Sequence, residues 1–233
     1  MIGILGGMGT QAGLDFCNKI VVLNRGKTDQ QYPKFVLYNK SDTPKRPENL
    51  KKYYNVLKEL VAGCLMLQKN NCKFIVMPCN TAHYWHDDIQ KRIKIPLLSM
   101  PKEVYFHTKK SCKKNSKIGI LCTEATIEAK VYSRYFDKDF NLVSPGKTLQ
   151  KKSVNKAIRY VKLGKVKEAE KVLRPAVNYL MKIKCKKIIL GCTELPIAIF
   201  AYKSFKKIKE SKIFIDPNLL LASVSMQKYK KNN

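Results

Sequence analysis

Acidic residues are scarce in this sequence, and the shortage bears on the partners it could have. Lys and Arg total 46 against 17 Asp and Glu, a formal net charge of +29 over 233 residues. An excess of this size is typical of proteins that bind nucleic acid. The lysines, however, are scattered over most of the expected helices and form no arginine-rich arm. We therefore interpret the charge as a solvated surface and expect no specific nucleic-acid partner.

Long apolar runs are missing as well. No segment approaches the ~20 apolar residues that a membrane-spanning helix needs. The sequence opens directly on the strand pattern MIGIL, without the basic segment and apolar core of a secretory signal. We expect a cytoplasmic protein with no membrane partner. Eight cysteines, several of them inside apolar strands, then favour reduced thiols over a disulfide framework.

A glycine-rich loop after the first strand lacks the companion that a nicotinamide site requires. Gly7, Gly9 and Ala12 satisfy the dinucleotide pattern, which lets a backbone approach a ligand closely. Dinucleotide sites also carry an acidic residue ~20 positions later, at the end of the second strand. The second expected strand ends at Asn39 instead. The loop therefore predicts close approach to a ligand, with no nicotinamide cofactor.

The most informative stretch surrounds Cys79. Phe74–Met77 is apolar and β-branched, as in a short buried strand, and Pro78 cannot extend a central ladder. Asn80 and Thr81 are residues that favour helix N-caps. Cys79 is therefore predicted at the carboxyl end of a strand and the start of a helix, where open α/β sheets bind ligands. A helix N-terminus at this place would lower the pKa of the thiol.

Two other roles for this cysteine are open. Cys79, His83 and His86 have spacings that zinc could use, but both histidines lie on the helix and no CxxC pair accompanies them. Cys79 could also form a disulfide with Cys192, although a reducing compartment would keep both as thiols. We predict neither a metal site nor a disulfide.

The sequence repeats itself in its two halves. Two segments align with an offset of 113, and a second pair with an offset of 116. The paired segments are Cys72–Thr81 with Cys185–Glu194, Ile2–Leu5 with Ile118–Leu121, and Lys94–Leu98 with Lys212–Asp216. Three correspondences in one order predict two homologous α/β halves related by a pseudo-twofold axis. Such an axis would bring Cys79 and Cys192 face to face across a cleft.

We therefore predict an α/β fold with mostly parallel sheets in two domains, and an active site in the cleft between them. The first domain is expected over 1–100 and 212–233, and the second over 101–211. Strands are expected at Met1–Leu5, Phe35–Asn39, Phe74–Met77, Ile95–Ser99, Ile118–Leu121 and Ile213–Ile215, with a helix break at Gly164.

The motifs GILGGMG, PCNTAH and GCTE, in this order, resemble the aspartate/glutamate racemase superfamily, and most closely its cofactor-independent aspartate racemases. The resemblance runs from Met1 to Pro217. Glutamate racemases carry an acidic residue in the first loop and a His after the second Cys-Thr. Met8 and Glu194 stand at these positions here, which favours the aspartate branch.

The resemblance implies a homodimer that interconverts L- and D-aspartate, with glutamate as a further candidate substrate, and that needs no pyridoxal phosphate. It implies that Cys79 and Cys192 are the two acid/base residues, one a thiolate and the other a thiol. Met8, Asn80, Thr81 and Thr193 are expected beside the substrate by their place in the motifs. Arg46 and Lys162 correspond to residues that hold substrate carboxylates, although Lys45 stands where Asp is common.

Thr123 occupies the place in the second half that the glycine loop holds in the first. Its hydroxyl would suit a substrate amine or carboxylate, and it would equally suit a helix cap. Two alternatives to the racemase are open. One is another two-cysteine member of the superfamily, a maleate isomerase or hydantoin racemase. The other is a basic nucleic-acid-binding protein on a degenerate enzyme fold.

Overall fold

The structure, a computed structural model, describes residues 1–45, 54–200 and 212–231. The chain folds into two compact units, Met1–Glu103 with Asn218–Asn233, and Val104–Pro217. The domain boundaries predicted from the sequence place 212–217 in the first domain. The structure places this segment in the second unit, because its strand pairs there.

The first unit contains a parallel sheet in the order β2-β1-β3. Its strands are β1 (Ile2–Gly6), β2 (Phe35–Asn39) and β3 (Phe74–Val76). The strand expected at Ile95–Ser99 is reduced to one bridge between Ile75 and Leu97. Ile75 N donates to the Pro96 carbonyl at 2.8 Å and Leu98 N donates to the Ile75 carbonyl at 2.9 Å, while Pro96 itself has no N–H to add to the ladder.

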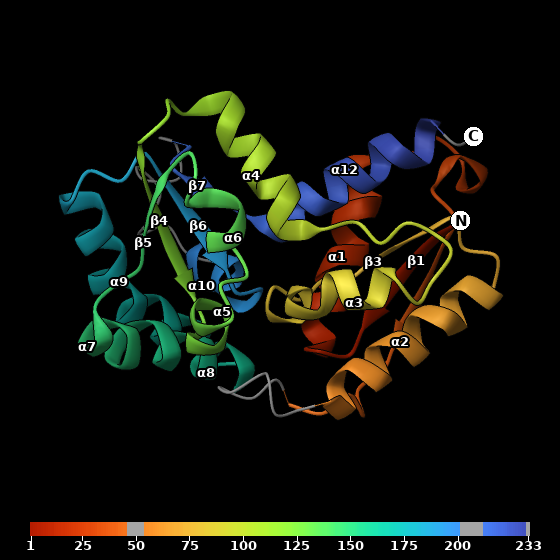
Figure 1. The fold of residues 1–233 in the computed structure, drawn as a ribbon, viewed down its shortest axis with the longest axis horizontal. Helices are drawn as coiled ribbons and strands as arrows, with labels where there is room; N and C mark the ends of the chain where they lie inside the picture. Colours follow the sequence, from red (N-terminus) through yellow and green to blue (C-terminus); the bar gives the residue numbers. More distant parts are fainter. Residues whose placement is uncertain (46–53, 201–211, 232–233) are drawn as a thin grey trace. The chain divides into compact units, whose positions relative to one another are not determined.

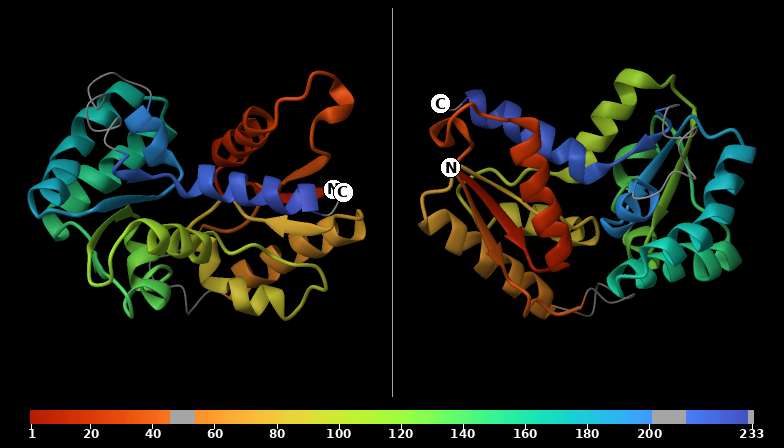
Figure 2. Two further views of the ribbon diagram at one scale, coloured as in Figure 1. Left: turned by 90° about the horizontal axis from the view of Figure 1, so that it is seen from above. Right: turned by 180° about the vertical axis from the view of Figure 1, so that it is seen from behind.

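Helices cover both faces of this sheet, as the alternation of side chains along β1 requires. Ile2 and Ile4 pack with residues of α1 (Thr10–Leu23) and α12 (Pro217–Lys231) on one face. On the other face lies α2 (Tyr54–Lys69), whose Gly63 lets the side chain of Leu5 approach closely. Asn218 ties α12 to α1 by donating to Asp15 Oδ2 at 2.8 Å, and the two helices run close together in Figure 2.

The second unit repeats this topology with four parallel strands in the order β5-β4-β6-β7. They are β4 (Lys117–Cys122), β5 (Asn141–Val143), β6 (Lys187–Gly191) and β7 (Phe214–Ile215). Strands β4, β5, β6 and β7 occupy the places of β1, β2, β3 and the Leu97 bridge. The prediction of an α/β fold with parallel sheets is confirmed, and the sequence repeat corresponds to a repeat of strand order.

Three helices bury one face of the second sheet: α8 (Lys156–Lys162), α9 (Val166–Lys182) and α10 (Glu194–Phe200). The predicted break between α8 and α9 is confirmed at Gly164, which has φ +73°. An aromatic cluster of Tyr105, Tyr132, Phe136 and Phe140 lies elsewhere in the unit.

The remaining helices are short, apart from α4, in which the chain passes from the first unit to the second. They are η1 (Asp29–Gln31), η3 (Thr81–Trp85), α3 (His86–Gln90), α4 (Met100–Ser111), α5 (Glu124–Glu128), α6 (Ser133–Phe136), α7 (Lys147–Leu149) and the π-helix η4 (Gln150–Asn155). Over the described ranges, no helix is both long and apolar enough to cross a bilayer.

Each sheet has one topological switch point, the kind of place at which open α/β sheets bind ligands. The chain leaves β1 toward β2 on one side, and β3 lies on the other side, so the order reverses between β1 and β3. The second sheet reverses in the same way between β4 and β6. Open α/β sheets bind ligands outside the carboxyl ends of the strands at such switch points. The glycine loop and Cys79 follow β1 and β3, and Thr123 and Cys192 follow β4 and β6.

Candidate active site

The loop after β1 is held against the end of β2. Gly7 has φ +88°, and a Cβ there would lie 2.2 Å from the backbone carbon of Lys40, so only glycine fits. Met8 follows and is buried. The close approach predicted for this loop is therefore a contact with the protein's own backbone at Lys40. This contact fixes the position of Met8.

Lys40 also organises the loop that follows β2. Its buried ammonium lies 2.9 Å from Asp42 Oδ2 and 2.7 Å from Glu59 Oε2 on α2. Hydrogen bonds to these carboxylates raise the pKa of Lys40, with Glu59 the stronger influence. The ion pairs anchor the loop to α2. Arg46, predicted to bind a substrate carboxylate, lies outside the described residues.

Cys79 lies after β3, as predicted, but the helix that follows differs from the expectation. It is a five-residue 3-10 helix, η3, followed by the short helix α3. Asn80 has right-handed helical torsion angles, and its side chain does not cap η3. Before it, Cys79 N donates to Met77 O at 2.8 Å in a tight turn around Pro78. Asn80 and Thr81 are buried beside Cys79.

His83 fixes the backbone at Cys79. Met100 N donates to its Nε2 at 3.1 Å, so Nε2 is the unprotonated nitrogen and Nδ1 carries the hydrogen. Nδ1 then donates to the carbonyl oxygen of Cys79 at 2.9 Å. His86 likewise reaches a backbone carbonyl, that of Leu97, at 2.9 Å. Both histidines of the zinc alternative are thus engaged with the backbone, and the described ranges contain no cluster suited to a metal ion.

Cys192 lies directly after β6, beside a carboxylate. Its Sγ donates a hydrogen bond to Glu194 Oε2 at 2.9 Å. Thr193 Oγ1 donates to the same oxygen at 3.2 Å. Lys162, at the end of α8, lies 3.6 Å from the other carboxylate oxygen of Glu194. The second unit therefore brings together three predicted site residues, Cys192, Thr193 and Lys162, around a residue that was not predicted to act on them.

Burial and a neighbouring carboxylate determine the acidity of Cys192. Burial raises the pKa of the Cys192 thiol well above its ordinary value, and the charge and hydrogen bond of Glu194 raise it further. Lys162 and a backbone hydrogen bond lower it by less. At Cys192, burial and the neighbouring carboxylate outweigh the influences that lower the pKa of the thiol. Cys192 rests as a thiol.

Thr123 caps α5. Its Oγ1 accepts from Thr126 N at 3.3 Å and lies 3.0 Å from Thr126 Oγ1. Thr123 follows the carboxyl end of β4, at the same edge of the sheet as Cys192. Just before it, the carbonyl of Cys122 accepts from buried Gln150 Nε2 at 2.8 Å, which attaches η4 to this edge. Of its two expected roles, the structure shows the helix cap.

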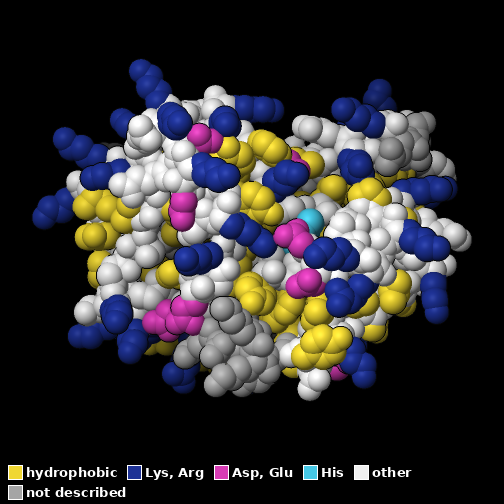
Figure 3. Space-filling model, in the orientation of Figure 1, with side chains coloured by type: hydrophobic (Ala, Val, Ile, Leu, Met, Phe, Trp, Pro, Cys, Tyr) yellow, Lys and Arg dark blue, Asp and Glu magenta, His cyan; other side chains and the backbone are white. Residues whose placement is uncertain are grey.

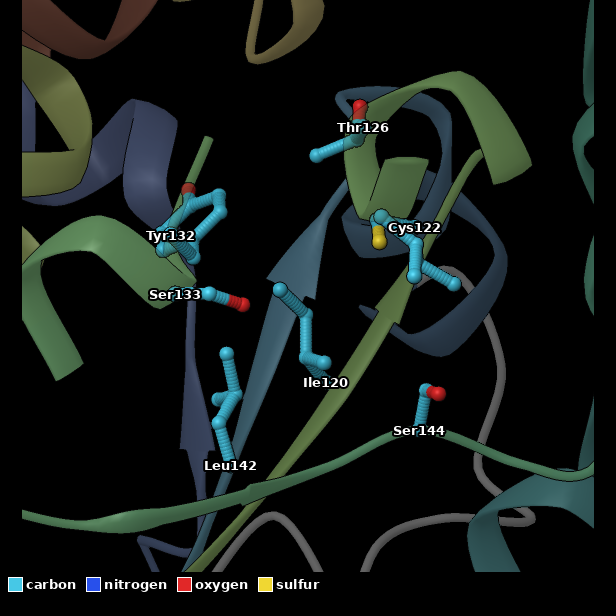
Figure 4. Close-up of a pocket in the computed structure, with 8 residues that line it drawn as sticks. Ile120, Cys122, Thr126, Tyr132, Ser133, Leu142 and Ser144 are labelled. Atoms are coloured by element: carbon cyan, nitrogen blue, oxygen red, sulfur yellow. The ribbon is translucent and has the colours of Figure 1, made fainter. Parts of the chain in front are cut away.

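A small cavity of about 70 Å³ lies in the second unit, apart from the cysteine motif (Figure 4). It is lined mainly by apolar groups and by the hydroxyls of Ser133, Ser144 and Thr126. None of the predicted site residues lines it. Tyr132 forms part of its wall, and burial, followed by the charges of Cys122, Asp216 and Cys192, raises the pKa of this phenol. The phenol is therefore a neutral group near Cys192.

Comparison with known proteins identifies the family of this chain. The sequence profile of the Asp/Glu/hydantoin racemase family matches residues 5–223. The chain belongs to this family. Among solved structures, the aspartate racemase of Picrophilus torridus superimposes with a TM-score of 0.82 at 28% identity, over 98% of this chain and 94% of that one. The glutamate racemase of Thermus thermophilus has the same fold, with a TM-score of 0.68 at 20% identity, over 99% of this chain and 80% of that one.

Among curated relatives of this racemase family, the broad specificity amino-acid racemase RacX of Bacillus subtilis is 30% identical over 138 residues. The match covers 58% of this chain and 59% of RacX, so the chain spans less than two thirds of that relative's length. Membership of the family, together with a fold shared with amino-acid racemases, supports amino-acid racemase activity.

Two residues that contact the cysteine motifs were not predicted to do so from the sequence. In the sequence, Glu194 serves only to separate family branches, although its position two residues after Cys192 places a carboxylate within reach of the thiol. His83 is considered there only as a metal ligand, although its spacing of four from Cys79 suits a hydrogen bond back to that carbonyl. In both cases the signal was a polar residue within one helical turn of a cysteine.

Proposed function

We propose that this protein is an aspartate racemase that needs no pyridoxal phosphate, nicotinamide or metal, and uses Cys79 and Cys192 as its two acid/base groups. The observation that carries the proposal is the equivalence of the two thiols. Each follows the strand that flanks a switch point, at the carboxyl edge of its own parallel sheet. A lone buried cysteine is usually inert. Two at matching sites of a structural repeat suit a reaction that needs two similar bases.

In the mechanism we propose, the two units present the sulfurs to opposite faces of the substrate Cα across a cleft. The thiolate of Cys79 takes the Cα proton, and the electron pair of the C–H bond stays on the substrate. The thiol of Cys192 then donates its proton to the other face, which leaves a thiol at Cys79 and a thiolate at Cys192. The reverse direction exchanges the roles. Backbone N–H groups that follow the two cysteines would stabilise the charge on the substrate carboxylate.

The substrate contacts follow from the charges. We assign the two carboxylates of aspartate to Arg46 and Lys162, with Met8, Asn80, Thr81, Thr123 and Thr193 beside the reacting centre. A guanidinium matches a carboxylate with two hydrogen bonds, whereas an ammonium is a point charge. Lys162 is exposed and already lies near Glu194, so its ammonium is available at the edge where Cys192 lies. We also propose that the enzyme is a cytoplasmic homodimer.

The experiment that tests this function is incubation of the purified protein with L- and D-aspartate in deuterium oxide. Chirality is followed by chromatography and Cα exchange by mass spectrometry. Aspartate of either configuration should become racemic, and the newly formed enantiomer should carry deuterium at Cα. Retention of configuration and of the Cα hydrogen in both enantiomers would refute the proposal. The assay is repeated after dialysis against a chelator, which should leave the rate unchanged.

A wider substrate range is the second candidate, and the similarity to RacX favours it. The same assay with glutamate, alanine and other amino acids separates the two. An aspartate racemase should convert aspartate far faster than the rest, whereas a broad-specificity enzyme should convert several amino acids at comparable rates. Maleate isomerisation and hydantoin racemisation, measured with the same preparation, test the other two-cysteine reactions.

A further inference from the structure

Glu194 is placed to control one of the two thiols, and the other thiol has a different kind of neighbour. Cys192 Sγ and Glu194 Oε2 are 2.9 Å apart, with the sulfur as donor. At Cys79, the 2.9 Å hydrogen bond joins His83 Nδ1 to the backbone carbonyl oxygen of Cys79 rather than to its sulfur. The two cysteine motifs are therefore alike in backbone position and unlike in the charge beside them.

The charges around Cys192 come from two elements. Glu194 begins α10 and provides the negative charge, while Lys162 ends α8 and lies 3.6 Å from Glu194 Oε1. Tyr132 is a neutral buried phenol whose pKa is raised by burial and then by the charges of Cys122, Asp216 and Cys192. A carboxylate beside a sulfur favours the protonated sulfur, and an ammonium beside the carboxylate weakens that effect. Glu194 and Lys162 thus act on the thiol in opposite directions.

We propose that Glu194 is a positioning residue that keeps the resting proton of the enzyme on Cys192, and that Lys162 opposes this effect. Cys192 is then the proton donor of the resting enzyme, and Cys79 is its base. This inference rests on the proposed two-cysteine mechanism and makes the two half-reactions unequal. Glu194 neither gains nor loses a proton; its carboxylate accepts the S–H hydrogen bond before turnover and repels the Cys192 thiolate after it.

The inequality has a kinetic signature. L- and D-aspartate have equal free energies, so kcat/KM must be the same in both directions. One turnover that uses the Cys192 proton leaves a thiolate next to Glu194, a state of higher free energy than the resting one. The two directions should therefore differ in kcat and in KM separately, in compensating proportion. Glu194→Gln, which removes the charge, should bring the two kcat values closer together.

The direct test measures the Cys192 sulfur and does not depend on turnover. In a Cys79→Ser background, Cys192 is alkylated by neutral iodoacetamide, and mass spectrometry of the peptide that contains Cys192 gives the rate. The rate is measured from about pH 6 to about pH 11, a range that spans ordinary thiol pKa values. Cys112, half-exposed in the same unit, serves as the internal reference. Glu194→Gln should move the midpoint of the Cys192 profile to lower pH, and Lys162→Gln should move it to higher pH.

Below the midpoint, a fall of one pKa unit raises the thiolate fraction tenfold, while lower basicity reduces its intrinsic reactivity about threefold. Glu194→Gln should therefore speed alkylation at about pH 8 by about threefold for each unit of pKa shift. Matched controls remove the same charges at exposed positions of the same unit, Glu168→Gln on α9 and Lys165→Gln just before it. Both controls should leave the Cys192 profile unchanged.

Either an unchanged midpoint in Glu194→Gln or shifts in the same direction for the Glu194 and Lys162 variants would overturn the inference. Equal shifts in the control variants would likewise overturn it, since net charge alone would then account for the effect. Failure of the proposed function is separate, because a protein with no racemase activity would still give an alkylation profile. Opposite midpoint shifts without any racemisation would retain the charge pair and refute the mechanism.

Discussion

Two of the eight cysteines differ from the others in position and surroundings. Cys64 and Cys122 are buried, and burial alone raises the pKa of both thiols, that of Cys64 to about 12. Cys192 is buried too, but a carboxylate and a lysine lie beside it. Cys79 follows a strand at the carboxyl edge of its sheet. The chemical reactivity of each cysteine should therefore depend on its neighbours and not on burial alone.

Cys79→Ser and Cys192→Ser should each abolish racemisation and leave the fold intact. A serine hydroxyl is too weak an acid and its alkoxide too strong a base to replace a thiol in proton transfer near neutral pH. Racemisation assays and circular dichroism on both variants check this, with Cys112→Ser as the control. Near-wild-type turnover in either variant would show that the two-base assignment is wrong.

His83→Leu should lower both stability and turnover. The substitution leaves the Cys79 carbonyl and Met100 N without their buried partner, and each such loss costs about 1–3 kcal/mol. Urea unfolding measures the first effect and racemisation the second. The exposed His107→Leu is the control and should change the free energy of unfolding by less than about 0.5 kcal/mol. Similar losses in both variants would contradict a specific role for His83.

The activity should persist to high pH on its alkaline side. Cys192 must be protonated to donate, and its raised pKa keeps it protonated above the ordinary thiol range. The pH dependence of kcat in the direction that uses Cys192 as donor should therefore fall only above about pH 9, the ordinary thiol range. Glu194→Gln should move this alkaline limb to lower pH. An alkaline limb that Glu194→Gln leaves in place would contradict the assignment of Cys192 as donor.

At the level of single residues, the sequence located the cysteines but not their acidity. The repeat of Cys72–Thr81 in Cys185–Glu194 was enough to single out Cys79 and Cys192. The direction of the Cys192 pKa depends on burial and on the rotamer of Glu194, which are tertiary properties that sequence spacing does not contain. The same holds for the tautomer of His83, which Met100 N sets from another element.

Among the elements, the loop after β1 depends most strictly on one residue type. Gly7 has a left-handed φ, and a side chain there would collide with backbone. Gly164 also has a left-handed φ, but nothing lies within 4 Å of the place that a methyl group would occupy, and Gly146 has neither restriction. These three positions separate strain from collision. They share one substitution, glycine to alanine, and differ in backbone φ and in surroundings.

Gly7→Ala should be severely destabilising, because its Cβ would lie 2.2 Å from a backbone atom that cannot move freely. Gly164→Ala should cost about 1–2 kcal/mol from the left-handed conformation alone. Gly146→Ala should change the free energy of unfolding by less than about 1 kcal/mol. Thermal and urea unfolding of the three variants give the comparison. Equal losses at Gly7 and Gly164 would show that the contact with Lys40 is not tight.

The sequence indicated the longer elements better than the short ones. The apolar strands β1, β2, β3 and β4 lie where their patterns predict. β5 was missed, because Asn141–Val143 is too short to show an alternation. The strand expected at Ile95–Ser99 was overestimated, since Pro96 limits its pairing. The helix after Cys79 is a 3-10 helix, a difference that capping residues in the sequence do not reveal.

The whole molecule carries an unusually large positive charge. Lys and Arg side chains are spread over the face shown in Figure 3 and do not gather at one place. At low ionic strength this charge should attract anionic amino acids and should also bind nucleic acid weakly and without sequence preference. We expect that the charged side chains mainly form a solvated surface.

Alkaline pH should destabilise the fold through its buried thiols. The folded-state pKa of Cys64 is raised to about 12 from 9.0, so its contribution is complete below about pH 9 and is lost as pH rises toward 12. Each such thiol removes about 1.4 kcal/mol of stability per pH unit in that window. Cys64→Ala should be less stable at about pH 8 but should lose less stability between about pH 9 and about pH 11. Parallel slopes in urea unfolding would contradict this.

The first unit is discontinuous in sequence, and this has a consequence for synthesis on the ribosome. Leu221, Ala222 and Met226 of the last helix fill the core between α1 and the first sheet. The second unit has all its residues once Pro217 has been made. Folding of a growing chain usually proceeds from the N-terminus. Here the later unit can be completed first, while the sheet face that α1 and α12 cover together stays only partly covered until the final helix is made.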